Sequence, residues 1–173
     1  MTILPINIPI FLKIKWYYQL KTINMKNIFD KKDNQELIAR VQKLTSASKS
    51  TWGEMSVSQM VLHCQKPLDV AEGKLELKRN IISFLFGKMA KKSFLQNEYF
   101  KKNLPTDKRF IIKSSPDFEK EKEVLCSQIA RFGAMGPRII ANSRHPFFGE
   151  MTEEEWGILQ YKHLDHHLKQ FGC

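Results

Sequence analysis

The chain has 173 residues, enough for one domain with a sizeable core, and 42% of its residues are hydrophobic. Its formal net charge is +10, and no nucleic-acid recognition motif accompanies the scattered lysines that carry the excess. No apolar run approaches the roughly 20 residues of a membrane-spanning helix. These features exclude a membrane-spanning chain, so we expect no membrane partner, and they favour a solvated basic surface over a nucleic-acid partner.

Three cysteines, Cys64, Cys126 and Cys173, are widely spaced along the chain. They form no Cys-x-x-Cys pair and no even-numbered disulfide framework. This use of cysteine favours a reducing compartment, so we expect a cytoplasmic protein.

The first 24 residues differ from the rest of the chain. The apolar stretch Ile3–Leu12 is interrupted by two prolines and has neither the basic start nor the small-residue cleavage site of a secretory signal. Met25 then opens an ordinary globular pattern. We therefore predict a domain over residues 25–173 preceded by an extension over residues 1–24. Our hypothesis is that translation starts at Met25.

Helix signals follow one another along this domain. Asp33 and Asn34 predict the start of a helix that runs to about Thr45. Ser56 and Gln59 have the spacing of a capping box and predict a second helix. Pro67 lies inside that second pattern and cannot donate a hydrogen bond to the carbonyl of His63, so we expect a bend there.

The middle of the chain is less regular. Residues 80–104 predict a short helix followed by a long surface excursion. Ser115, Pro116 and Asp117 form a strong start signal with Ser115 as the cap. The helix that they begin is predicted to run to about Phe132 and to be ended by Gly133, Gly136 and Pro137.

A second capping-box pair, Thr152 and Glu155, predicts the start of the final helix. The helices that begin near residues 33, 56, 115 and 152 are the principal elements, and no segment shows convincing strand alternation. The predicted fold class is all-α, with the helices packed as a bundle.

The final helix carries two histidines, His163 and His167, that are four residues apart and therefore lie on one face. At about 100° per residue, both fall within the apolar face, whereas His166 lies at its edge. Ile158 and Lys162 lie opposite, toward solvent. Buried imidazoles need partners. Either a shared metal ion or two separate sets of hydrogen bonds would meet that need.

A metal site usually requires a third protein ligand, and His63 on the second helix is the obvious candidate. On the wheel of its own helix, His63 lies about 110° from the centre of the apolar face. Its spacing alone therefore predicts a residue at the boundary of the core.

Other reactive side chains have simpler explanations. His145 precedes a proline and can border a pocket or fix its loop by a hydrogen bond; we favour the structural role. Cys64 can be a nucleophile, but its position on the apolar face predicts a small buried hydrophobic residue. The acidic run 153–155 is explained by the dipole of the helix that it begins.

Several motifs together resemble one family. They are Trp52-Gly53-Glu54-Met55-Ser56, Gln59-Met60, His63-Cys64, His145-Pro146-Phe147-Phe148-Gly149 and Trp156 through Gly172. They resemble a domain-of-unknown-function branch of the DinB/YfiT-like superfamily over residues 26–172. The resemblance implies a DinB-like four-helix bundle with a divalent metal ion, held by His63, His163 and His167.

Zinc and nickel are the metals that best suit this implied site. Three imidazoles leave a coordination position for water or substrate, as in catalytic sites. Relatives in the superfamily include thiol S-transferases, so the resemblance implies a metal-dependent transferase or hydrolase that acts on a small molecule such as a low-molecular-weight thiol. It also implies a homodimer. The alternatives are a non-catalytic bundle that binds a small ligand or a partner, and nucleic-acid binding through the lysines.

Overall fold

The computed structural model describes residues 9–10, 25–78, 81–97 and 99–173. The predicted extension, residues 1–24, lies almost entirely outside the described residues. The described part is mostly α-helical, as predicted. Its elements are α2 (Lys31–Lys43), α3 (Val57–Ala71), α4 (Ile81–Gln96), the short 3-10 segment η1 (Lys108–Phe110), α5 (Phe118–Met135), the 3-10 segment η2 (Gly136–Ile139), β1 (Arg144–His145), β2 (Gly149–Glu150) and α6 (Glu153–Gln170). Within the described ranges, no helix is both long and apolar enough to cross a membrane.

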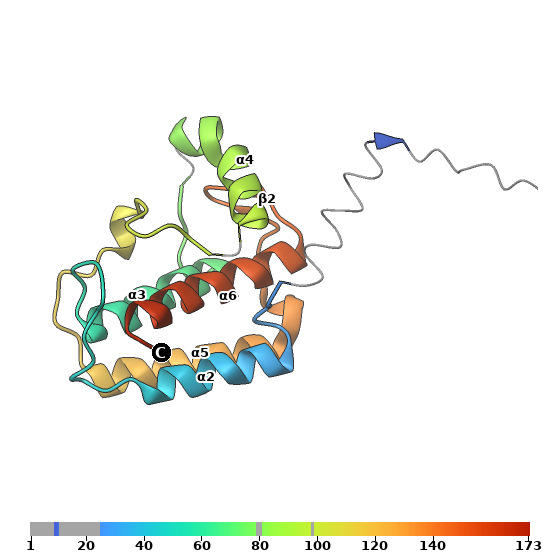
Figure 1. Cartoon of the computed structure of the whole chain (residues 1–173). Coiled ribbons are helices and arrows are strands. Elements are labelled where there is room, and N and C mark those ends of the chain that lie inside the picture. The colour runs from blue at the N-terminus through green and yellow to red at the C-terminus, as the bar shows by residue number, and fades with distance from the viewer. Residues whose placement is uncertain (1–8, 11–24, 79–80, 98) are drawn as a thin grey trace, which may run out of the picture.

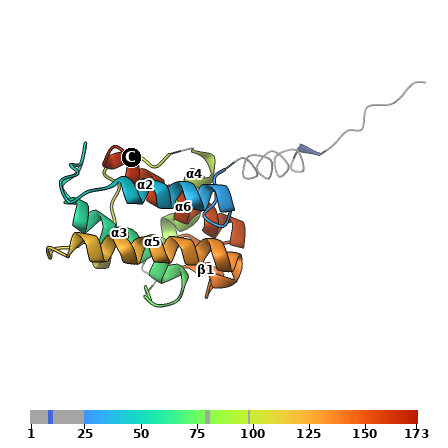
Figure 2. The ribbon, with the colours of Figure 1, turned by 90° about the horizontal axis from the view of Figure 1, so that it is seen from below.

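Four helices enclose the core, and each packs against two of the others: α2 and α3 both contact α5 and α6. Figures 1 and 2 show these four helices side by side, and Figure 1 shows α4 outside them. Their inward side chains form one hydrophobic cluster, whose largest fully buried members include Leu37, Met60, Leu68, Leu125, Phe132, Trp156 and Leu164. The histidines on α3 and α6 therefore lie on two neighbouring helices.

Both predicted capping boxes are present. The Ser56 hydroxyl accepts from the backbone N–H of Gln59, whose side chain accepts in return from the N–H of Ser56. Thr152 and Glu155 make the same reciprocal pair at the start of α6. These local hydrogen bonds satisfy backbone donors that a helix start leaves unpaired. They fix where the two histidine-bearing helices begin.

Two predicted starts were displaced by a few residues. Asp30, not Asp33, caps α2, because its carboxylate accepts from the N–H groups of Lys32 and Asp33. Asp117, not Ser115, caps α5. In each case the acid that stands closest to the first helical residue reaches the free donors.

The predicted end of α5 near Phe132 is three residues short, since the helix continues through Gly133 to Met135, where the second expected terminator, Gly136, follows. Gly136, with a φ of 60°, ends it. The side chain of the buried Asn34 approaches Gly133 closely and donates to the carbonyls of Ile28 and Ile129. Gly133 therefore serves close packing between α2 and α5 rather than helix termination.

The final helix is buried on more sides than its pattern predicts. Ile158 and Lys162, expected on the solvent side, are only 0% and 6% exposed. The Lys162 ammonium donates to the backbone carbonyls of Phe94 and Asn97. The segment at the end of α4 covers this side of α6. A helical wheel considers one helix alone and cannot show contacts with another segment. That segment also differs from expectation, since α4 has 16 residues rather than a short run.

Candidate metal centre

Three histidines from two helices converge. His63 on α3 is 4% exposed and His167 on α6 is 8% exposed, and His163 lies between solvent and core. One ring nitrogen from each residue lies within 4.8 Å of the other two. The Nε2 atoms of His63 and His163 are 3.1 Å apart. The group can therefore hold one metal ion.

The outer nitrogens of two rings have fixed partners. Nδ1 of His63 lies 2.9 Å from the carbonyl oxygen of Phe110, and Nδ1 of His167 lies 2.9 Å from Oε1 of Gln170. Both partners are acceptors, so each Nδ1 carries the proton and each Nε2 has a free lone pair. The Gln170 side chain is held in this orientation by its amide nitrogen Nε2, which donates a 2.6 Å hydrogen bond to the carbonyl oxygen of Trp52. Metal-ligating histidines are commonly held in this way.

His163 has a different environment. Its Nδ1 atom is buried and has no hydrogen-bond partner among the described residues. Its Nε2 faces His63. This ring is therefore placed by packing and by the other imidazoles rather than by a backbone or amide acceptor.

Burial keeps the three imidazoles neutral. Desolvation lowers the pKa of His63, although the hydrogen bond to the Phe110 carbonyl partly offsets this effect. Desolvation also lowers the pKa of His167, to about 3. The pKa of His163 is lowered well below its usual range by burial and by the neighbouring histidines. At neutral pH all three rings have the uncharged form that binds metals.

This donor set fits a first-row divalent cation. Two nitrogens that share a tetrahedral zinc ion at about 2.05 Å lie about 3.4 Å apart, close to the 3.1 Å between His63 and His163. Three neutral imidazoles without a carboxylate match zinc or nickel better than magnesium or calcium, which prefer oxygen ligands.

The burial of His63 is greater than its helical position predicts. The wheel placed this residue at the boundary of the core because it considers only α3. The 3-10 segment η1 lies over the ring, and Phe110 at its end makes both the carbonyl contact and an edge-on ring contact with centroids 6.1 Å apart. A segment 47 residues away thus completes the burial.

Two supporting groups were missed by the sequence reasoning. Gln170 follows His167 by three residues on α6, a spacing that predicts contact on a helix, so this signal was available. The carbonyl of Phe110 gave none, because any residue supplies a backbone carbonyl and only the path of the chain brings this one to His63.

The remaining candidates lie outside the group. His166 packs against the rings of Trp52 and Phe100, with centroids 5.8 and 6.1 Å away. Nδ1 of His145 accepts from the N–H groups of Phe147 and Phe148, at 3.0 and 3.1 Å. His145 thus stabilises the turn between β1 and β2, as predicted.

Cys64 is a small buried residue rather than a nucleophile. It is 1% exposed, and its thiol lies 3.6 Å from the sulfur of Met60. Burial raises its pKa, which disfavours the thiolate. The sequence prediction for this cysteine is confirmed.

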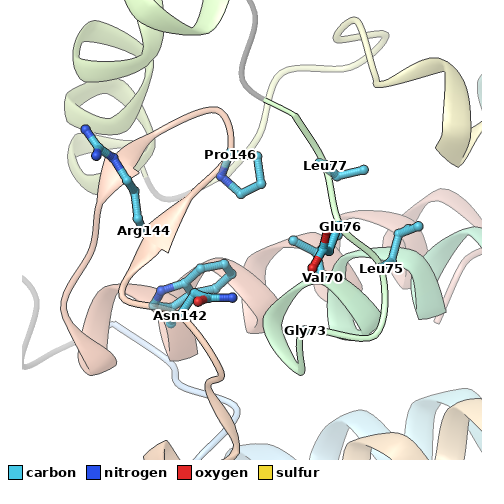
Figure 3. A pocket seen from close by; sticks show the side chains of 9 residues that line it. Val70, Gly73, Leu75, Glu76, Leu77, Asn142, Arg144 and Pro146 are labelled. Atoms are coloured by element: carbon cyan, nitrogen blue, oxygen red, sulfur yellow. The ribbon is translucent and has the colours of Figure 1, made fainter.

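A separate cavity of about 240 Å³ lies beside the β1–β2 turn, away from the three histidines. Figure 3 shows residues from the end of α3 and the segment after it on one side, and Asn142, Arg144 and Pro146 on the other. Trp156 also lines it, and the indole N–H of this residue has no hydrogen-bond partner in the described part of the chain.

Comparison with known proteins identifies one family. A family of proteins of unknown function, DUF1569, matches residues 24–172. The chain belongs to this family. The matched range contains all three histidines and leaves out the first 23 residues. No curated protein and no solved structure matches the chain.

Proposed function

We propose that this DUF1569 protein is a metal-dependent enzyme with a DinB-like four-helix bundle formed by α2, α3, α5 and α6. In this proposal His63, His163 and His167 hold a divalent cation, zinc or nickel. The observation that carries the proposal is the convergence of three neutral imidazoles from two helices, two of them with Nδ1 held by an acceptor.

The proposed reaction class is a thiol S-transferase or hydrolase acting on a small molecule. Three protein ligands leave one position for a substrate atom, and a cation there would stabilise a thiolate or lower the pKa of a water molecule. The chain's own contribution is orientation and desolvation. Phe110 and Gln170 hold two rings in place, and burial keeps the histidines uncharged.

The resemblance to DinB-like proteins supports the choice of a low-molecular-weight thiol as substrate. It also supports a homodimer. The three unpaired cysteines support a reducing, cytoplasmic location. The scattered lysines, without a recognition motif, support a small-molecule rather than a nucleic-acid partner.

Elemental analysis of protein purified without a histidine tag tests the site. We expect close to one equivalent of zinc or nickel. Enzymatic turnover is tested with small thiols and electrophiles before and after treatment with a chelator. Activity that disappears with the metal and returns on its addition supports the proposal. A protein that never retains metal, or whose metal content is unchanged by His163→Ala, contradicts it.

The second candidate is a non-catalytic binding protein, and the cavity beside the β1–β2 turn favours it. A small ligand that enters this cavity would contact Asn142, Arg144 and Trp156. Such a ligand raises the melting temperature equally in the wild type and in His63→Ala. A rise that depends on His63 instead assigns the ligand to the histidine group.

A further inference from the structure

Helix α4 exposes an unusual amount of apolar surface. Six large apolar side chains within its first nine residues are 49–77% exposed: Ile81, Ile82, Phe84, Leu85, Phe86 and Met89. Scattered exposed apolar residues are normal on a protein surface, but a contiguous group of this kind marks an interaction site. Figure 1 shows α4 outside the four packed helices, so this side has no cover from them.

The orientation of α4 is fixed by its opposite side. Ser83, Gly87 and Phe94 are the buried residues of the helix. A Cβ atom at Gly87 would come within 2.1 Å of the carbonyl oxygen of Phe147, so the helix backbone packs directly on the β1–β2 turn. The Lys91 ammonium adds a 2.6 Å ion pair to Glu155 at the start of α6. Because these contacts prevent rotation of the helix, the apolar side chains cannot turn inward.

All the charged side chains of α4 are basic. The helix contains three lysines, at positions 88, 91 and 92, and no acidic residue. Lys91 forms an ion pair with Glu155. Lys88 and Lys92 are exposed and pair with no carboxylate of the described residues. At about 100° per residue, both lie within about 20° of Ile81, on the same face as the apolar side chains, in the turns that follow Leu85 toward the C-terminal end of the helix. Long lysine stems can extend along the apolar surface and place their ammonium groups beyond it.

These charges favour one occupant of the surface over another. If a second copy covered this face with its own α4, lysines would face lysines with no acid between them. An anionic lipid surface instead offers acyl chains to the apolar residues and phosphates to the ammonium groups. The net charge of +10 on the whole chain acts in the same direction.

We propose that α4 attaches this protein to an anionic membrane surface, against the expectation from the composition that it has no membrane partner. The helix lies in the plane of the interface, with Phe84, Leu85 and their apolar neighbours among the acyl chains. Lys88 and Lys92 contact the lipid phosphates. The attachment is peripheral, since no described helix can span a bilayer. It is independent of the proposed metal chemistry.

Co-sedimentation of the full chain with lipid vesicles tests the proposal. The vesicles contain either phosphatidylcholine alone or phosphatidylcholine with phosphatidylglycerol. We expect binding to the anionic vesicles, weakened by salt, and much less binding to the neutral ones. The double variant Lys88→Gln/Lys92→Gln should lower the partition coefficient by roughly 10–30-fold. Phe84→Gln/Leu85→Gln should lower it at least about tenfold.

Matched controls separate this helix from the general surface. Lys113→Gln/Lys120→Gln removes the same charge elsewhere, and Ile111→Gln/Val124→Gln removes exposed apolar side chains elsewhere. Both controls should retain most of the binding. All variants change exposed residues, so circular dichroism should show unchanged helicity and melting temperature.

Two results would overturn the proposal. One is wild-type protein that remains in solution with both kinds of vesicle. The other is a loss of binding that is equal in the α4 variants and in the controls. Analytical ultracentrifugation tests the alternative. A wild-type dimer that does not bind vesicles and becomes monomeric in Phe84→Gln/Leu85→Gln would assign the surface to a second copy.

Discussion

The Nε2 atoms of His63 and His163 lie 3.1 Å apart, although 100 residues separate the two histidines in the chain. The carbonyl of Phe110 holds the proton of His63 on Nδ1, so Nε2 of His63 presents a lone pair to His163. The neighbouring His167 presents its Nε2 lone pair because Gln170 holds its Nδ1 proton. The fold thus concentrates electron-pair donors that a cation can satisfy together.

Removal of one of these donors should abolish metal retention. We expect His163→Ala to retain less than about a tenth of an equivalent after dialysis, because two imidazoles alone hold zinc or nickel weakly. His166→Ala is the matched control, since His166 is the next histidine on α6 but lies outside the group. Elemental analysis of both variants measures the difference. Equal metal content in the two would contradict the assignment of ligands.

The amide of Gln170 should tune the affinity for the metal without binding it. Replacement by leucine removes the acceptor for Nδ1 of His167, and losses of this kind cost about 10–100-fold in metal affinity. Gln170→Glu keeps an acceptor at this position and should retain the affinity or raise it. Titration in competition with a chromogenic chelator gives both values. A similar loss in both variants would show that Gln170 acts through the Trp52 carbonyl and the general packing instead.

Local features of the fold could be predicted from the sequence, because their causes lie within a few residues. The capping boxes at Ser56 and Thr152 are formed by side chains three positions apart, and both are present. The i, i+4 relationship between His163 and His167 is equally local. The start of α2 was displaced to Asp30, which stands directly before the helix and accepts from its first free N–H groups, whereas Asp33 accepts from the N–H of Asn27.

Features that depend on distant contacts could not be predicted in the same way. His63 is buried because Phe110 covers it, and Lys162 is buried because the carbonyls of Phe94 and Asn97 accept its hydrogen bonds. A helical wheel registers neither partner. The sequence offered His63 as a candidate third ligand, but its periodicity placed it at the boundary of the core, and only the resemblance to a known superfamily favoured it as a ligand.

His145 should make the stability of the fold depend on pH. Burial lowers its pKa to about 3, whereas an unperturbed histidine has a pKa of about 6.5. Between these values the unfolded chain binds a proton that the folded chain does not. The stabilisation is therefore complete above about pH 6.5 and is lost as the pH falls toward 3.

The loss attributable to His145 should be about 1 kcal/mol per pH unit below pH 6. His145→Asn can retain an acceptor for the N–H groups of Phe147 and Phe148 but does not titrate in this range. Urea unfolding of both proteins between pH 4 and pH 7 isolates the effect as a difference. Parallel curves for the two proteins would show that the ring is protonated without cost in the folded state.

The substitution Gly157→Ala should destabilise the fold, whereas replacing a glycine within a helix by alanine usually stabilises it. Inside an exposed helix this change stabilises by up to about 1 kcal/mol. At Gly157, however, a Cβ atom would come within 2.0 Å of Oδ1 of Asn27 and 2.7 Å of the Phe29 ring. The segment before α2 is also held to this point by a 3.2 Å hydrogen bond from the Ile28 N–H to the Gly157 carbonyl.

We therefore expect Gly157→Ala to destabilise the fold by about 1–3 kcal/mol, since residues 27–29 must move away from α6. Chemical denaturation followed by circular dichroism measures this loss. The double variant Gly157→Ala/Asn27→Ala removes the closest clashing atom and should recover part of the stability. A single variant as stable as the wild type would contradict the close packing of residues 27–29 on α6. The route by which the chain enters α2 would then need revision.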